Sequence, residues 1–251
     1  MTRCALIAIL LMCAACSTSS QPLSKPQPDR ASDINLEIGI DYFRKGNLSA
    51  AKEKIDRAIE QNPRNARAQA AAGLLYDRLN DIKKSEGSFE KALSIEPNNP
   101  EIQNNYAVVL CKRDKQPRGE KYFVEAGSNP LYKTPEVAYL NAGNCARSAG
   151  NLENAEAHYR KALSISPRFS EALYQMADLE YSKQNYMSAR GFMQRYTDTG
   201  KTSDAAILWL GLRIEKGLGN AAAARDYAQR LKLEYPNSAE TKQMLETERK
   251  P

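Results

Sequence analysis

The feature that most constrains the fold is a pattern that recurs about every 34 residues along most of the chain. Small residues form its first column, with successive separations of 34, 34, 36, 34 and 34 residues: Gly39, Gly73, Ala107, Gly143, Ala177 and Gly211. A second small residue follows each of them by twelve positions, at Ala51, Ser85, Gly119, Ala155, Ala189 and Ala223. Four positions further lies a large side chain, at Ile55, Phe89, Phe123, Tyr159, Met193 and Tyr227. Self-similarity at a fixed period indicates a repeat protein whose units stack in a row.

These columns have a physical explanation if each unit is a pair of antiparallel helices. Two helices can cross closely only where both side chains are small, and the large side chain then fills the space between units. Proline ends the second helix of three units, because it cannot continue a helix; these prolines are Pro63, Pro97 and Pro167. We therefore expect an all-α solenoid of six helix pairs over residues 32–237, with units starting near residues 32, 66, 100, 136, 170 and 204.

The pattern resembles the tetratricopeptide repeat, which implies a right-handed superhelix with the first helix of each unit on the inner face. Two extra residues in SNPLYKTP, residues 128–135, should widen the connection between units 3 and 4. Units 1 to 4 carry an alanine three positions after the large side chain, at Ala58, Ala92, Ala126 and Ala162. Units 5 and 6 carry Tyr196 and Arg230 at this position, which predicts looser packing there. The polar residues 238–251 are expected to form a capping helix or tail, because the end of a solenoid needs a solvated cover.

The chain starts with the features of a secretory signal peptide. Arg3 precedes a continuous apolar run of twelve residues, 4–15. A helix that spans a bilayer needs about 20 apolar residues, so this run is too short to span and instead fits the core of a cleaved leader. We expect residues 1–15 to be removed.

A lipid anchor is predicted where the leader ends. Ala14 and Ala15 directly before Cys16 resemble the bacterial lipobox, in which the cysteine is acylated, although Cys13 stands where that motif usually has leucine. The alternative is that Cys16 is an ordinary residue of a conventional signal peptide. Serine after the cysteine resembles an outer-membrane address. Residues 16–31 are rich in Pro, Ser and Gln and cannot bury enough surface to fold, so we expect them to tether a periplasmic domain to the outer membrane.

The charge pattern argues against several classes of function. The formal net charge is +6, and removing the leader, which holds one basic and no acidic residue, leaves +5. Basic and acidic residues are interleaved, which favours a solvated helical surface over a nucleic-acid-binding face. His158, the single histidine, is expected to be structural. No catalytic triad or phosphate-binding loop is recognisable, so we expect a monomeric, non-enzymatic protein without cofactor, metal or small-molecule substrate.

Two cysteines of the repeat region are predicted to pair. Cys111 and Cys145 fall near the end of the first helices of units 3 and 4, which are neighbours in such a solenoid. Nearby thiols tend to form a disulfide in an oxidising periplasm. The bond would close a loop of about 35 residues and contribute roughly 3–4 kcal/mol in the chain-entropy model. The alternative is two buried thiols that pack as small apolar groups.

The inner face of the first two units offers a candidate binding surface. Leu36, Ile40 and Phe43 share one face of the first helix, with Leu74 of the second unit adjacent. We assign the core stripe of this helix to Ile38, Gly39 and Tyr42, so the other three apolar side chains of the helix are in surplus, and such an exposed apolar patch indicates a partner site. The alternative is that the end of the tether folds over them. Further along, the inner face turns polar, with Asn104, Lys112, Asn144, Arg147, Asp178 and Tyr181. Asn104 and Asn144 can offer a donor and an acceptor to a bound peptide.

The whole arrangement resembles the PilF/PilW pilotin family of type IV pilus lipoproteins. The resemblance is carried by the acylated cysteine, the six repeats and the stretches NNYAVVLC (104–111), LNAGNCARSAGN (140–151), ALYQMADLEYSKQNYMSAR (172–190) and LWLGLRIEKGLGN (208–220). It implies a protein that binds the pilus secretin subunit and helps it reach the outer membrane and assemble, in support of twitching motility. The alternative is a periplasmic scaffold lipoprotein of another envelope machine, for outer-membrane protein assembly or cell-wall synthesis.

Overall fold

The computed structural model describes residues 28–249, and over that range the secondary structure is entirely helical. The predicted leader, the lipidation site at Cys16 and most of the predicted tether lie outside the described residues. Thirteen helices follow one another in this part of the chain: α1 (Pro28–Arg44), α2 (Leu48–Gln61), α3 (Ala66–Arg78), α4 (Ile82–Ile95), α5 (Pro100–Lys112), α6 (Gln116–Ser128), α7 (Pro135–Ser148), α8 (Leu152–Ile165), α9 (Ser170–Ser182), α10 (Tyr186–Thr197), α11 (Ala205–Gly217), α12 (Ala221–Glu234) and α13 (Ala239–Arg249).

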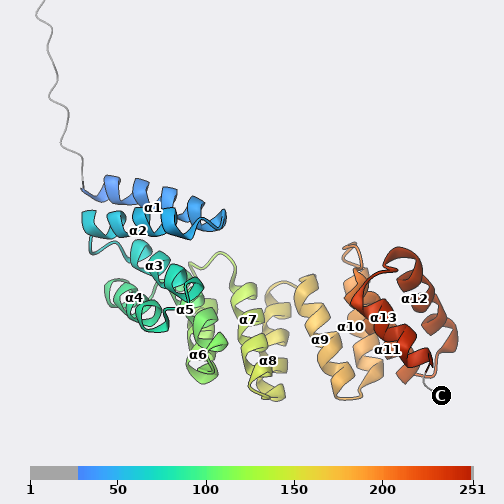
Figure 1. The fold of residues 1–251 in the computed structure, drawn as a ribbon. Coiled ribbons are helices and arrows are strands. Elements are labelled where there is room, and N and C mark those ends of the chain that lie inside the picture. Colours follow the sequence, from blue (N-terminus) through green and yellow to red (C-terminus); the bar gives the residue numbers. More distant parts are fainter. Residues whose placement is uncertain (1–27, 250–251) are drawn as a thin grey trace, which may run out of the picture.

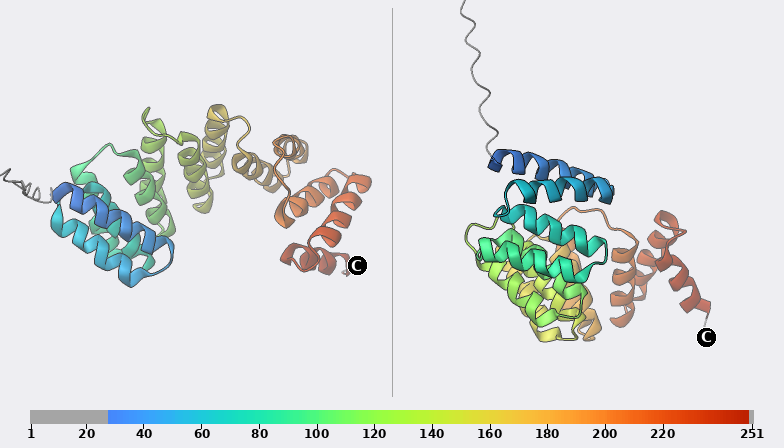
Figure 2. Two further views of the ribbon diagram at one scale, coloured as in Figure 1. Left: turned by 90° about the horizontal axis from the view of Figure 1, so that it is seen from above. Right: turned by 60° about the vertical axis from the view of Figure 1, so that its left-hand side comes forward.

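The helices form six antiparallel pairs that stack into a curved solenoid, so the predicted fold class is confirmed (Figure 1). Seen from above, the stack bends into an arch (Figure 2). The first helices of neighbouring pairs contact one another, as in α1 with α3 and α3 with α5. That contact places the first helices on the inner side of the curve.

The glycines of the first repeat column allow the two helices of a unit to pack closely. A Cβ atom added to Gly73 would lie 2.5 Å from Cδ2 of Phe89, the large residue 16 positions later. The same conflict arises between Gly39 and Ile55 and between Gly211 and Tyr227. Phe89 itself is fully buried and stacks on Tyr106 of the next unit, with ring centroids 4.9 Å apart. The repeat period therefore reflects two contacts of the large side chain, one with the glycine of its own unit and one with the following unit.

The connections between units explain two departures from the pattern. Residues 129–134 join units 3 and 4, whereas only 62–65 and 96–99 join the units before them, so the extra residues lengthen this connection as predicted. Before unit 6 the connection is 198–204. The longer connection leaves room for Tyr196, which is only 4% exposed. The expectation of loose packing at Tyr196 was wrong.

The last unit is shifted by one residue relative to the repeat. Asn220 caps α12 and lies 35 positions after Asn185, which precedes α10. As a result Leu231 is fully buried in the core of the last unit, and Arg230 lies beside it and pairs with Glu234. Arg230 therefore does not occupy the core position that the strict period assigned to it.

The solenoid ends with α13, which packs on α11 and α12. Its buried side chains are Met244, which joins the core of the last unit, and Thr241. The Ser238 hydroxyl accepts a hydrogen bond from the Thr241 amide at 3.1 Å and so caps the helix at its start. The remaining side chains of α13 are mostly polar, as the exposed end of a solenoid requires.

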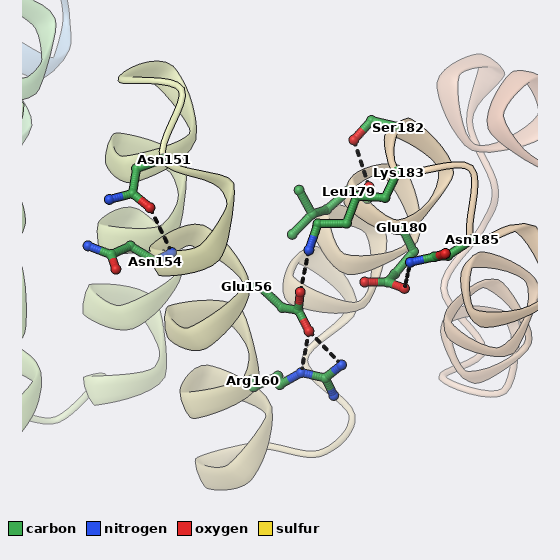
Figure 3. Close-up of polar contacts among 9 residues, drawn as sticks. All are labelled: Asn151, Asn154, Glu156, Arg160, Leu179, Glu180, Ser182, Lys183 and Asn185. Carbon is green, nitrogen blue, oxygen red and sulfur yellow. Dashed lines mark hydrogen bonds and ion pairs between the residues drawn. The ribbon is translucent and has the colours of Figure 1, made fainter.

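Ion pairs connect neighbouring units on the outer side of the arch. Figure 3 shows Glu156 of α8 between Arg160 of the same helix and Lys183 at the end of α9. Hydrogen bonds from Lys183 and Arg160 lower the pKa of the Glu156 carboxyl, which therefore stays ionised. The pair with Lys183 joins unit 4 to unit 5.

Candidate functional site

The outward and inward faces of α1 differ from the sequence-based assignment. Leu36 is fully buried, packed with Ala58 of α2 and Ala68 of α3, and is therefore not available to a partner. Ile38, assigned above to the core, is 40% exposed. The reason is that α1 packs on α2 and α3 together, so its buried stripe runs through Leu36 and Gly39. The prediction that Ile38 belongs to the core and Leu36 to the partner site was wrong.

The other three predicted apolar residues line one groove on the inner face. Ile40 and Phe43 come from α1 and Leu74 from α3, and each is partly exposed. The cavity between them measures about 580 Å³, and its apolar wall is completed by Ala70, Ala71 and Ile102. Cavities of roughly 300–1,000 Å³ are the usual size of sites that hold a ligand or side chains of a partner. We call this cavity the N-terminal groove.

Polar side chains border the N-terminal groove. Arg44 and Arg67 are exposed at its edge, and Glu101 and Asn105 come from α5. Asn99 also lies here, but its side chain already accepts a hydrogen bond from the Ile102 amide and caps α5. The groove therefore has an apolar floor and an edge on which two cations face one carboxylate.

Helix α5 also contributes to the N-terminal groove, which was not predicted from the sequence. Counted from residue 100, Ile102 and Asn105 are the third and sixth residues of the third unit, and neither was among the residues assigned to the inner face. Curvature of the solenoid brings the start of α5 against α3, so the buried Ile102 forms part of the groove wall and Asn105 is partly exposed beside it. A sequence pattern carries no signal for that curvature.

The two asparagines predicted to bind a peptide lie away from the N-terminal groove. Asn104 accepts a long hydrogen bond from Asn141 at 3.4 Å. Asn144 accepts one from the Tyr159 hydroxyl at 2.8 Å and, with Asn141, borders a shallow hollow of about 280 Å³. Burial raises the pKa of Tyr159 to about 12, so its hydroxyl stays a donor at physiological pH. The inner face thus holds separate surfaces, not one continuous groove from Leu74 to Asn144.

The predicted cysteine pair lies at the joint between units 3 and 4. In the structure a disulfide joins Cys111 of α5 to Cys145 of α7, with Cα atoms 5.7 Å apart. The pair spans the joint next to the lengthened connection 129–134. Its formation in the protein made by cells stays a prediction.

His158 has a structural contact. Its Nε2 atom lies 2.8 Å from a carboxylate oxygen of Glu120, which joins α8 to α6. Within residues 28–249 no group of three or more His, Cys, Asp or Glu side chains has the arrangement of a metal site. In the same part of the chain, none of the helices combines the length and the apolar character needed to cross a bilayer.

Comparisons with known proteins agree with this architecture. Tetratricopeptide repeat family models match residues 36–100, 88–121, 137–169 and 205–238. The chain is 26% identical over 236 residues to the type IV pilus assembly protein PilF of Pseudomonas aeruginosa, which covers 94% of this chain and 93% of that one.

Two solved structures share the fold over most of their length. The crystal structure of PilW, described as a widely conserved type IV pilus biogenesis factor, is 32% identical and superimposes with a TM-score of 0.76 over 85% of this chain and 98% of its own. The structure of Pseudomonas aeruginosa PilF is 26% identical and gives a TM-score of 0.75 over 88% of this chain and 99% of its own.

Proposed function

Because the chain belongs to the family of the type IV pilus biogenesis factors PilW and PilF, we propose that it acts as a pilotin for the pilus secretin. In this proposal the N-terminal groove binds a segment of the secretin subunit in the periplasm. A lipid on Cys16 holds the complex at the outer membrane, where the subunits assemble into the pore. In this role the protein binds the secretin subunit and holds it at the outer membrane, and it carries out no chemical reaction.

The observation that carries the proposal is the apolar floor of the N-terminal groove. Ile40, Phe43 and Leu74 line one cavity there, and each packs partly on the core beneath it while part of its side chain stays exposed. Exposed apolar surface of this kind marks partner sites. An amphipathic helix or an extended segment that inserts one large side chain would gain about 1.5–3 kcal/mol from its burial. The cations Arg44 and Arg67 at the edge favour a segment with an acidic residue beside its apolar one.

The lipid anchor supports the same role from the sequence. The run Ala14-Ala15-Cys16 provides the acylation motif, and the serine after it favours the outer membrane. Stable anchoring takes more than one acyl chain, which a fully processed lipoprotein cysteine carries. Replacing Cys16 by serine should release the protein from membranes. A Cys16→Ser protein that still sediments with the outer membrane would argue against this anchor.

The groove is tested by a pair of double variants. Phe43→Asp with Leu74→Asp places two charges on the groove floor, whereas Ile38→Asp with Leu79→Asp places two charges on exposed parts of α1 and the end of α3. Each pair is introduced in place of the wild-type gene, and circular dichroism checks that both purified proteins keep their helices. We expect the first pair to lose secretin multimers and twitching and the second to retain both.

Two outcomes oppose the proposal in different ways. Normal secretin multimers with Phe43→Asp and Leu74→Asp, at unchanged helicity, would remove the groove as the binding site. A deletion strain with intact secretin multimers and a general loss of outer-membrane barrel proteins would instead assign the chain to the assembly machinery of those proteins.

A further inference from the structure

A second cluster of side chains on the inner face has a chemistry unlike that of the N-terminal groove. It lies on the first helices of units 4, 5 and 6, which are α7, α9 and α11. Two arginines and one aspartate form its centre, two aromatic rings lie against Arg213, and a third aromatic residue lies near the aspartate: Arg147, Asp178, Arg213, Tyr181, Trp209 and Tyr174. We call it the arginine–aromatic cluster.

The cluster occupies the same repeat positions as the N-terminal groove. Counted from the first residue of each unit, Ile40 and Leu74 stand at position 9 of units 1 and 2, and Asp178 stands at position 9 of unit 5. With the one-residue shift of unit 6, Arg213 also stands at position 9 and Trp209 at position 5. Since position 9 lines the groove in units 1 and 2, the cluster faces the same inner surface.

Asp178 holds both arginines in place. Its Oδ2 atom accepts from Nη2 of Arg147 at 2.5 Å, and its Oδ1 atom lies 3.5 Å from Nη2 of Arg213. Nη1 of Arg147 also donates to the side chain of Gln175 at 3.1 Å. The three charged side chains remain 22–30% exposed, so solvent and a partner can reach them.

Aromatic rings fix the second arginine further. The Arg213 guanidinium lies 4.6 Å from the centre of the Tyr181 ring and 5.5 Å from that of Trp209. Rings on the faces of a guanidinium hold its plane while its edge stays open to hydrogen bonding. Arg213 is thus held in one orientation before any ligand arrives.

The charges of the cluster are not balanced within it. Two guanidinium groups share the single carboxylate of Asp178, and each guanidinium has five N–H donors. Asp204 lies near Tyr174, but its carboxylate accepts from the Ile207 amide and caps α11. A second carboxylate placed between the two arginines would complete the pairing, and the adjoining rings would cover an apolar neighbour of that carboxylate.

We propose that the arginine–aromatic cluster is a second protein-binding site, which takes an extended acidic segment with an aromatic or aliphatic residue beside its carboxylate. A carboxylate of the segment accepts hydrogen bonds from Arg147 and Arg213, and its apolar neighbour lies on Trp209 and Tyr181. The site is independent of the pilotin role proposed for the N-terminal groove. It would let one chain hold two partners of different chemistry on one inner face.

Trp209 makes this site directly observable, because it is the single tryptophan of the chain. The full-length mature protein is titrated with the blocked peptide Gly-Asp-Phe-Glu-Phe-Asp-Gly, and separately with Gly-Asn-Phe-Gln-Phe-Asn-Gly, which has the same shape without charge. We expect the acidic peptide to change the tryptophan emission saturably and the amide peptide to leave it unchanged. Raising the salt concentration from about 0.05 to 0.5 M should weaken binding of the acidic peptide, since salt screens exposed charges.

Variants separate binding from a merely structural network. Arg147→Gln and Arg213→Gln should each lower the affinity for the acidic peptide by about tenfold or more. Arg160→Gln, which removes an exposed cation from the outer side of unit 4 (Figure 3), should leave the affinity unchanged. Asp178→Asn should tighten binding, because both arginines then lack their internal carboxylate.

The proposal is overturned if wild-type protein shows no saturable response to the acidic peptide up to millimolar concentration, or binds the amide peptide equally well. It is also overturned if folded Arg147→Gln and Arg213→Gln bind the acidic peptide as the wild type does. A network that only braces units 4 to 6 predicts those results, together with a lower melting temperature for Asp178→Asn and no gain in affinity.

Discussion

A methyl group added at Gly73 tests the physical basis of the repeat. In Gly73→Ala the new Cβ would lie 2.5 and 2.6 Å from two ring carbons of Phe89, far inside van der Waals contact. The ring cannot move away freely, because Phe89 is fully buried and stacks on Tyr106 at 4.9 Å. Either the ring gives up that stacking or the two helices of unit 2 separate.

The size of the effect follows from three contributions. Forcing an extra methyl group into a packed core costs about 1–3 kcal/mol, and loss of an aromatic pair costs about 0.5–1.5 kcal/mol. Alanine is better than glycine in a helix by about 1 kcal/mol. The net expectation is that Gly73→Ala lowers the free energy of unfolding by about 0.5–3.5 kcal/mol.

Gly87 provides a matched control in the same helix pair. It lies inside α4, it is exposed, and a Cβ added there meets no atom within 4 Å. Gly87→Ala should therefore raise the stability by up to about 1 kcal/mol. Urea denaturation followed by circular dichroism measures both variants. The reasoning is refuted if Gly73→Ala is as stable as the wild type, or if the two substitutions change stability in the same direction.

Three further predictions concern individual side chains or pairs of them. Replacing Cys111 and Cys145 by alanine should lower the free energy of unfolding by about 3–4 kcal/mol, since the bond joins residues 34 positions apart; two maleimide-reactive thiols in denatured, unreduced wild type would show that the bond is absent. Leu36→Asp should melt the first unit, with a loss of about 3 kcal/mol or more, while Ile38→Asp changes stability by less than about 1 kcal/mol; equal melting temperatures would contradict the burial of Leu36. Burial raises the pKa of Tyr159 from 10.0 to about 12, so the folded state holds this proton more tightly than the unfolded state. The stabilisation of the folded state by this protonated tyrosine is present below a pH of about 10, and roughly 3 kcal/mol of it is lost as the pH rises through 12. Tyr159→Phe should make unfolding less sensitive to alkaline pH than the wild type, and an unchanged pH dependence would show that this tyrosine does not titrate in that range.

The repeat and the residues of the N-terminal groove could be predicted from the sequence to different extents. Period and fold class followed from the glycine column, because Gly73 and its counterparts face a large side chain at a fixed distance along the chain. Ile40, Phe43 and Leu74 were placed on the inner face because that face repeats with the units. Leu36 was misplaced because the buried face of α1 depends on how α3 packs against α1, which the sequence pattern does not determine.

The arginine–aromatic cluster shows where a strict period fails. Arg147, Asp178 and Tyr181 were recognised as polar residues of the inner face, but the partners of Asp178 were not. Trp209 and Arg213 escaped notice because unit 6 is shifted by one residue, which moves them off the positions assigned to the inner face. That shift originates in the connection 198–204, whose length a helix period does not fix.

The central claim is that the inner face of the first units binds the secretin subunit. Site-specific cross-linking in cells tests this claim most directly. A photoreactive side chain replaces Phe43 in one strain and the outward-facing Ile38 in another, and the products are probed for the secretin. We predict a cross-link to the secretin subunit from position 43 and none from position 38. Equal labelling from both positions, or no secretin product from position 43 in cells that assemble the pore normally, would contradict the account.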